Sequence, residues 1–183
     1  MFIISAMIAF TFLLIGCGGS GGMQAVNGPS WYTGVEGEDP GFLYGKANAK
    51  SSDMQLAIDK ATADARSQVA QAVKVRVDDD TKTMKQEAGQ QDSMDVTKFF
   101  SEASELIASE TLSGSTVDKQ ETFKDGGIYS SFVRVKYNKS GVDASLVQKV
   151  KDDQEMYARF RAQQAFKDLQ DSVDKMKQQE GNK

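Results

Sequence analysis

Residues 52–78 read SDMQLAIDKATADARSQVAQAVKVRVD. Ser52 and Gln55 form the S-x-x-Q pattern of a capping box, which predicts that a helix begins here. Apolar residues then recur every three or four positions along one side of that helix, namely Ile58, Ala61, Ala65, Val69 and Ala72. Valines at 73, 75 and 77 alternate with polar residues, and this alternation predicts a half-buried strand directly after the helix.

The segments on either side of this stretch complete an expected α+β fold. A first strand is predicted at residues 42–49, because the turn residues Asp39-Pro40-Gly41 precede it. A second helix follows the predicted strand, with an apolar face made by Val96, Phe99, Phe100, Ala103 and Ile107. Two β-type runs, 111–123 and 128–137, flank an Asp-Gly pair that favours a hairpin. We therefore expect a two-layer fold, with helices packed on a small, mainly antiparallel sheet.

The C-terminal region, residues 142–183, is predicted to be a long helix that follows the α+β domain of residues 31–141. Its apolar spacing changes phase at Gln163-Gln164, which argues against one continuous coiled-coil seam. The first half is expected to pack on the domain and the second half to project from it. The projecting half then either contacts another subunit or forms a solvated, frayed end.

An apolar run from Phe2 to Ile15 opens the chain and ends at Gly16-Cys17. The run is too short for a membrane-spanning helix, which needs roughly 20 residues. It fits the apolar region of a secretory signal that ends in a small residue, so residues 1–16 are predicted to be a signal peptide cleaved between Gly16 and Cys17. The Lys or Arg that usually begins such a signal is missing from residues 1–5.

Leu14-Ile15-Gly16-Cys17 resembles the bacterial lipobox. In such signals the cysteine thiol receives a diacylglyceryl group, the preceding peptide is removed, and the new amino terminus is acylated. The resemblance implies that Cys17 is a lipid anchor, and several acyl chains make such an anchor durable. The alternative for this single cysteine is a free thiol. Residues 17–30 are rich in Gly and Ser and predict a flexible linker that spans roughly 20 Å.

Composition excludes several kinds of chemistry. The 183 residues include no His and one Cys, and the net charge is −4. A Ser-His-Asp relay and the usual zinc sites need His, and a disulfide within the chain needs a second Cys. The acidic balance provides no basic field for nucleic acid.

The run Asp78-Asp79-Asp80 lacks the spacing of a calcium loop and predicts a solvated strand end. We expect neither enzymatic activity nor a metal or other cofactor, although catalysis by carboxylates stays open.

Several motifs in this order resemble one bacterial family. They are Pro29-x-Trp31 after a lipobox, Tyr44-Gly45-x-Ala47, the alanine-rich helix over residues 57–70, and the step into Val73-x-Val75-x-Val77. The set is similar to the lipoproteins typified by the Lpp lipoprotein of about twenty kilodaltons, a group that includes lipoproteins of the flagellar basal disk. The resemblance implies a small two-layer α+β domain without catalytic residues. Only Cys17 carries over as a residue with a defined chemical role.

The combined features predict a lipid-anchored protein of the outer membrane, on its periplasmic face or at the cell surface. Gly18 follows the cysteine, and a glycine at this position resembles the sorting signals that permit transport to the outer membrane. The expected role is structural, with partners that are further copies of the chain and other envelope or flagellar ring proteins. The alternative is a tethered module that binds a ligand or a host partner and has no part in motility.

Overall fold

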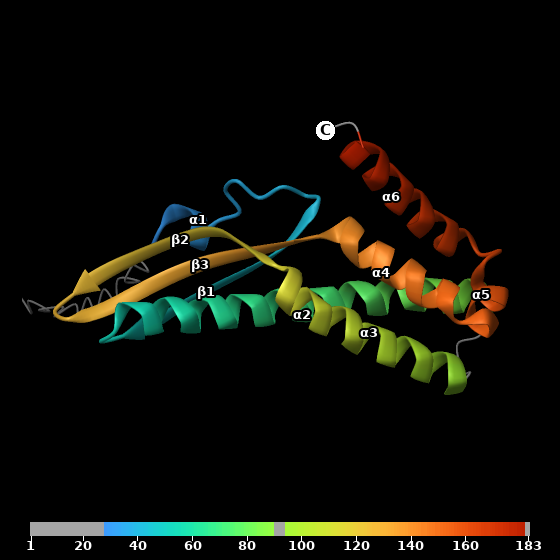
Figure 1. The fold of residues 1–183 in the computed structure, drawn as a ribbon, viewed down its shortest axis with the longest axis horizontal. Coiled ribbons are helices and arrows are strands. Elements are labelled where there is room, and N and C mark those ends of the chain that lie inside the picture. Colours follow the sequence, from blue (N-terminus) through green and yellow to red (C-terminus); the bar gives the residue numbers. More distant parts are fainter. Residues whose placement is uncertain (1–27, 90–93, 182–183) are drawn as a thin grey trace, which may run out of the picture.

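The computed structural model describes residues 28–89 and 94–181, and within them six helices accompany one three-stranded antiparallel sheet. Figure 1 shows α2 running beneath the sheet and on toward the C-terminal helices. In chain order the elements are α1 (Ser30–Thr33), β1 (Phe42–Ser51), α2 (Met54–Glu87), α3 (Met94–Gly114), β2 (Thr116–Asp125), β3 (Ile128–Asn138), α4 (Lys139–Asp152), α5 (Gln154–Phe160) and α6 (Gln164–Gly181). The expected α+β class is confirmed.

The sheet has the strand order β1-β3-β2, so β3 lies in the centre. Gly126 and Gly127 connect β2 to β3 and have φ values of 55° and 99°, the positive φ that a two-residue type I′ hairpin requires at both positions. The predicted hairpin is therefore confirmed. Its first strand begins at Thr116, later than expected, because α3 continues through Gly114. Thr111 is buried in that helix, where its hydroxyl donates to the Ile107 carbonyl.

The predicted strand at residues 73–78 is wrong, because these residues continue α2. Val73 and Val77 are four residues apart and fully buried, whereas Val75 is 61% exposed. A strand would have placed all three valines on one face. The β-branched valines favour a strand locally, but packing of residues four apart against neighbouring helices decides the conformation.

The start of α2 also differs from the expected capping box. Asp53, rather than Ser52, is the N-cap residue, and its side chain accepts a hydrogen bond of 2.8 Å from the Leu56 amide. The Asp53 amide in turn donates to the Ser51 hydroxyl. An aspartate is among the best N-cap residues, so one side chain satisfies an amide that the helix leaves without a partner.

Buried residues in α2 recur at intervals of four for most of its length. They are Ala57, Ala61, Ala65, Val69, Val73, Val77 and Thr81, followed by Met84. A residue in an α-helix turns about 100°, so each interval of four rotates the buried position by about 40°. The buried line thus winds around α2. Its first half contacts Val133 and Val135 of the sheet, and its second half joins the core of the helices.

Small residues bring α2 into backbone contact with β1. Gly45 faces α2, and a Cβ atom placed on it would lie 2.0 Å from the Ala65 carbonyl oxygen. Ala47 and Ala61 are buried in the same cluster. The alanines that define this part of the helix are therefore needed for a close approach of helix and sheet, as well as for hydrophobic burial.

The expected C-terminal helix is present as α6, and two shorter helices, α4 and α5, precede it in the region where one continuous helix was expected. The change of phase at Gln163-Gln164 does mark a break, between α5 and α6. A second break falls at Asp153, whose carboxylate accepts from the amides of Glu155 and Met156 and caps α5.

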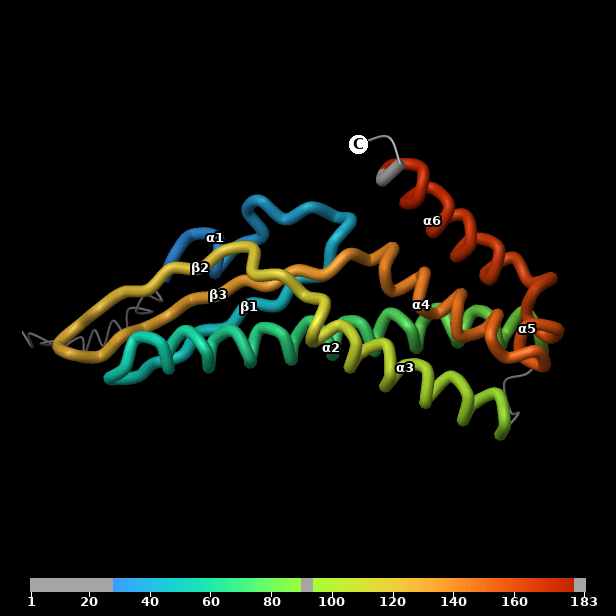
Figure 2. Tube along the Cα trace, in the orientation of Figure 1, coloured from blue at the N-terminus to red at the C-terminus, as the bar shows by residue number. Residues whose placement is uncertain are grey.

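The second half of this region does not project from the fold. Figure 2 shows α6 turning back from α5 toward the middle of the molecule. Phe166, Leu169 and Val173 of α6 are buried in the same core as Leu146 of α4 and Phe100 of α3. These apolar residues therefore complete the core of their own chain, which excludes a fully solvated end for this part of α6.

We predict that Gly45→Ala lowers the free energy of unfolding by about 1–3 kcal/mol, the usual range for overpacking. The added methyl group would meet both the Ala65 carbonyl oxygen and Val69 Cγ2, the latter at 2.9 Å. Urea unfolding followed by circular dichroism measures the change. Gly34→Ala is the matched control, because its nearest new contact, the Ser30 carbonyl oxygen, would lie at an ordinary 3.5 Å. Equal stability of the two variants would contradict the close packing.

Candidate anchor site and the N-terminal strap

Gly16 and Cys17, the predicted cleavage and lipidation residues, lie outside the residues that the structure describes. The structure does show where the chain that follows them joins the fold. A Cβ on Gly28 would lie 2.8 Å from Cε1 of Phe132, so the backbone at Gly28 rests on that ring. Pro29 is already buried and α1 begins at Ser30, so residues at the end of the expected 17–30 linker belong to the folded body.

Residues 28–41, which we name the strap, run across the face of the sheet that α2 leaves uncovered. In β3, Val133 and Val135 point toward α2 and are buried in its cluster. Phe132 and Arg134 lie at the alternate positions and therefore point to the opposite face, where they contact the strap. Figure 1 shows α1 and the rest of the strap on the side of the sheet away from α2.

Arg134 fixes the strap to the sheet. Its side chain is 1% exposed, and its guanidinium donates from Nη1 to the Glu36 carbonyl at 2.9 Å and from Nη2 to the Gly37 carbonyl at 3.0 Å. Its Nε donates to Oδ2 of Asp118 on β2 at 2.6 Å. Gly37 has a φ of 67°, a conformation that glycine adopts without strain. One buried cation thus joins the strap to both strands of the hairpin.

Aromatic rings surround this cation. The guanidinium carbon of Arg134 lies 5.0 Å from the ring centre of Tyr44 and 5.9 Å from that of Trp31. Trp31 is 5% exposed, and its indole N–H donates to the Glu121 carboxylate of β2. Stacking on two rings compensates in part for the loss of water around the charge. Trp31 therefore anchors the strap in the core at the edge of the domain.

Asp118 accepts from both Arg134 and Lys136, whose Nζ lies 2.9 Å from Oδ1 of Asp118. Burial raises the pKa of the Asp118 carboxyl, but the hydrogen bonds and positive charges of Lys136 and Arg134 lower it more, so that this pKa ends below its usual value. The hydrogen bond to Asp118 raises the pKa of Lys136. A lowered carboxyl pKa contributes stability above the unfolded value, and that contribution disappears as the pH falls through the folded value.

A second ionic group joins α2, α4 and α6. Arg76 donates from Nη2 to Oδ1 of Asp143 at 2.6 Å, and the Ser172 hydroxyl donates to Oδ2 at 2.8 Å. Asp143 is 2% exposed, and each of its two carboxylate oxygens accepts a hydrogen bond inside the helical core. Burial raises the pKa of nearby Asp80, with Arg76 acting in the opposite direction. The contacts of Asp143 hold α2, α4 and α6 together, whereas Oδ2 of Asp80 is buried and has no hydrogen-bond partner.

The run Asp78-Asp79-Asp80 lies on α2 and does not form the strand end that was expected. Consecutive residues on a helix point about 100° apart, so the three carboxylates diverge. Asp79 pairs with Lys82, and Asp80 faces Arg76. Among residues 28–89 and 94–181, no group of three or more Asp, Glu, Cys or His side chains is placed to hold a metal ion.

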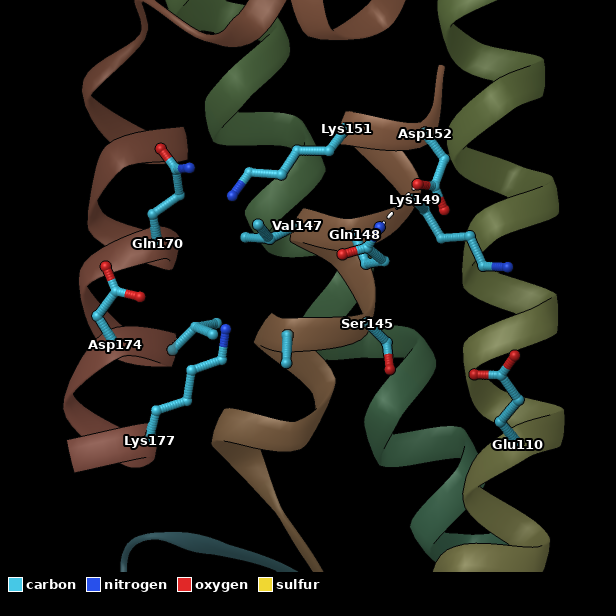
Figure 3. Close-up of a pocket in the computed structure, with 12 residues that line it drawn as sticks. Glu110, Ser145, Val147, Gln148, Lys149, Lys151, Asp152, Gln170, Asp174 and Lys177 are labelled. Carbon is cyan, nitrogen blue, oxygen red and sulfur yellow. Dashed lines mark hydrogen bonds between the residues drawn. The ribbon is translucent and has the colours of Figure 1, made fainter. Parts of the chain in front are cut away.

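A cavity of about 440 Å³ lies between α3, α4 and α6. Figure 3 shows Lys151 and Lys177 pointing into the gap between α4 and α6, while Lys149 extends toward α3. Three lysines and three acidic residues line this cavity, which are Lys149, Lys151, Lys177, Glu110, Asp152 and Asp174. Because the charges balance, the lining favours neither an anion nor a cation.

Sequence reasoning missed the role of Arg134. The signal was present, because a single arginine interrupts the apolar run Phe132-Val133-Arg134-Val135 in a strand. A charged residue at such a position indicates either an exposed face or a buried partner. The partners, however, are backbone carbonyls of residues almost one hundred positions earlier, and only the folded chain brings them together.

One known protein family matches the part of the chain that contains the strap and the sheet. A family model described as LPP20 lipoprotein matches residues 29–136, which span the strap, β1, α2, α3, β2 and most of β3. A search of curated proteins found no match, and a search of solved structures found none either. In the part of the chain that the structure describes, every helix is too short or too polar to cross a membrane.

We predict that Arg134→Met releases the strap. Asp118 and two strap carbonyls lose their donor, and loss of one partner from a buried ion pair costs about 3–5 kcal/mol. Asp118 retains Lys136, so we expect the low end of that range. Hydrogen exchange of residues 28–41 should accelerate more than exchange of α2. Arg161→Met, at an exposed position between α5 and α6, is the control. Unchanged exchange in the strap would contradict this role of Arg134.

Proposed function

We propose, because the chain belongs to the LPP20 lipoprotein family, that this lipoprotein of the cell envelope is held in the outer membrane by acyl chains on Cys17. Its folded body acts as a structural component of an envelope assembly and catalyses no reaction. The flagellar basal-body ring or disk is the assembly that we propose, since members of this family build such structures.

The observation that carries the anchoring proposal is the order of three features. A lipobox ends at Cys17, a Gly- and Ser-rich segment follows it, and the family match begins at residue 29. Pro29 is also buried in the folded body. The order supports an acylated amino terminus, a short tether and a folded domain, with the membrane contact supplied by lipid rather than by a spanning helix.

The structural role is supported by the edges of the sheet. Among residues 28–89 and 94–181, the strand order β1-β3-β2 leaves one side of β1 and one side of β2 without a neighbouring strand. Exposed strand edges offer backbone donors and acceptors to a neighbouring molecule. A bulge between Val117 and Lys119 interrupts the register of β2, so the regular part of that edge lies nearer the hairpin turn.

We predict that Cys17→Ala moves the protein out of the membrane fraction, because the anchor requires the thiol. Mass spectrometry of the wild-type amino terminus should show acyl chains on residue 17 and no residues before it. Ser20→Ala, which changes the same segment but leaves Leu14–Cys17 intact, is the matched control and should remain membrane-bound. An unmodified wild-type thiol would contradict the anchoring proposal.

We predict that deletion of the gene reduces swimming and removes density around the outer ring of purified basal bodies. The purified lipoprotein should also form large, ordered oligomers in detergent, as judged by light scattering and electron microscopy. Normal swimming in the deletion strain would contradict the flagellar part. A monomer that binds a ligand saturably would favour the alternative of a tethered binding module.

A further inference from the structure

One end of the molecule carries apolar side chains that the fold leaves uncovered. We name this end the tip surface; it consists of Met54, Leu56, Phe123 and Ile128, which are 45–49% exposed. Met54 and Leu56 lie in the first turn of α2, and Phe123 and Ile128 flank the hairpin turn. Figure 1 places the start of α2 and the hairpin turn together at one end, with α5 at the opposite end.

Strand register explains why these residues share one end. Ser51, the last residue of β1, pairs with Tyr129 of β3, and Ile128 pairs with Asp125 across the hairpin turn. The start of α2 follows Ser51 by three residues and must therefore lie beside that turn. Four large apolar side chains thus come from two separate segments of sequence and lie around the same corner of the sheet.

The strap joins the fold close to this end. Phe123 packs edge-on against Phe132 at 5.8 Å between ring centres, and Gly28 rests on the same Phe132 ring. A hollow of about 720 Å³ lies beside these residues, and Lys50 and Lys124 contribute to its lining. The chain from the predicted anchor thus joins the fold nearer to the tip surface than to the helical end.

The length of chain between Cys17 and Gly28 limits which part of the body meets the lipid. Eleven residues span at most about 40 Å when fully extended. Phe132 lies four positions along β3 from Ile128, so the hairpin turn lies roughly 14 Å from where the chain arrives. The opposite end lies roughly 40 Å away along α2, and contact there would require the tether at its full length.

We propose that the tip surface docks onto the lipid bilayer that holds the Cys17 anchor, with Phe123 and Ile128 inserted at the level of the headgroups. This inference rests on the lipid anchor of the proposed function. Lys50 and Lys124 are accompanied by Asp53 and Asp125 at the same end, so the local charge is nearly balanced. Contact therefore depends on burial of apolar surface and is insensitive to salt.

A fluorescence experiment on the full lipidated chain tests the orientation. Acylation consumes the only native thiol, so Ile128→Cys provides a unique site for an environment-sensitive dye. Asp125→Cys is a second tip position in case the first variant folds poorly, and Ala162→Cys is the control at the exposed turn between α5 and α6. The labelled proteins are reconstituted into phosphatidylethanolamine–phosphatidylglycerol vesicles with or without a nitroxide-labelled lipid.

The expected result is a blue-shifted emission at residues 128 and 125 that the nitroxide lipid quenches and that high salt does not change. The dye at residue 162 should show neither effect. Equal quenching at both ends, or none at the tip, would overturn the orientation while the protein still floats with the vesicles. A blue shift without quenching would indicate contact with a second copy and would also overturn it. Failure of the wild-type protein to float would instead contradict the lipid anchor itself, and this proposal with it.

Discussion

The close contact between α2 and the sheet sets the arrangement of the elements that pack on α2. Gly45 leaves no room for a side chain against the Ala65 carbonyl, so helix and strand lie backbone to backbone at this point. Because buried residues then recur at intervals of four, the buried face of α2 rotates away from the sheet as the helix continues. The second half of α2 consequently offers Val73, Val77 and Met84 to α3, α4 and α6. One helix therefore organises two cores that differ in their partners.

The elements that could be predicted from sequence are those whose signals are local. Gly126-Gly127 defines the hairpin because the turn itself requires positive φ, and the apolar face of α3 follows from its own spacing. The valines at 73, 75 and 77 misled the prediction because alternation and a spacing of four share the positions 73 and 77. Only Val75 distinguishes them, and its exposure depends on what packs against the helix. The fold of α6 onto α4 was missed for the same reason, since its apolar stripe fits a subunit interface as well as an internal core.

Arg134 shows how the strap differs from an ordinary tail. A buried charge costs free energy unless every donor has a partner, and the guanidinium finds its partners in one carboxylate, two strap carbonyls and two aromatic rings. Apolar packing alone would tolerate small shifts of the strap, whereas the hydrogen bonds from Arg134 hold the strap in one position. A pull on the chain before Gly28 is therefore resisted by the central strand of the sheet, through Arg134 and through Phe132. The family match includes both Arg134 and the strap residues whose carbonyls it binds, Glu36 and Gly37.

The tether and the tip surface together determine how the sheet would stand on a membrane. All three strands end or turn near the tip, so docking of that end directs the strands away from the bilayer. In the proposed orientation, the edges of β1 and β2 that have no strand partner among residues 28–89 and 94–181 would face sideways, in the plane of the membrane, where neighbouring anchored molecules would lie. The end formed by α5 would then be directed away from the lipid, and the cavity between α3, α4 and α6 lies on the helical part of the body. Lateral contact through the sheet and contact with other envelope proteins through the helices would thus use separate surfaces. The proposed ring would therefore form through the sheet edges and leave the helical end accessible to other envelope proteins.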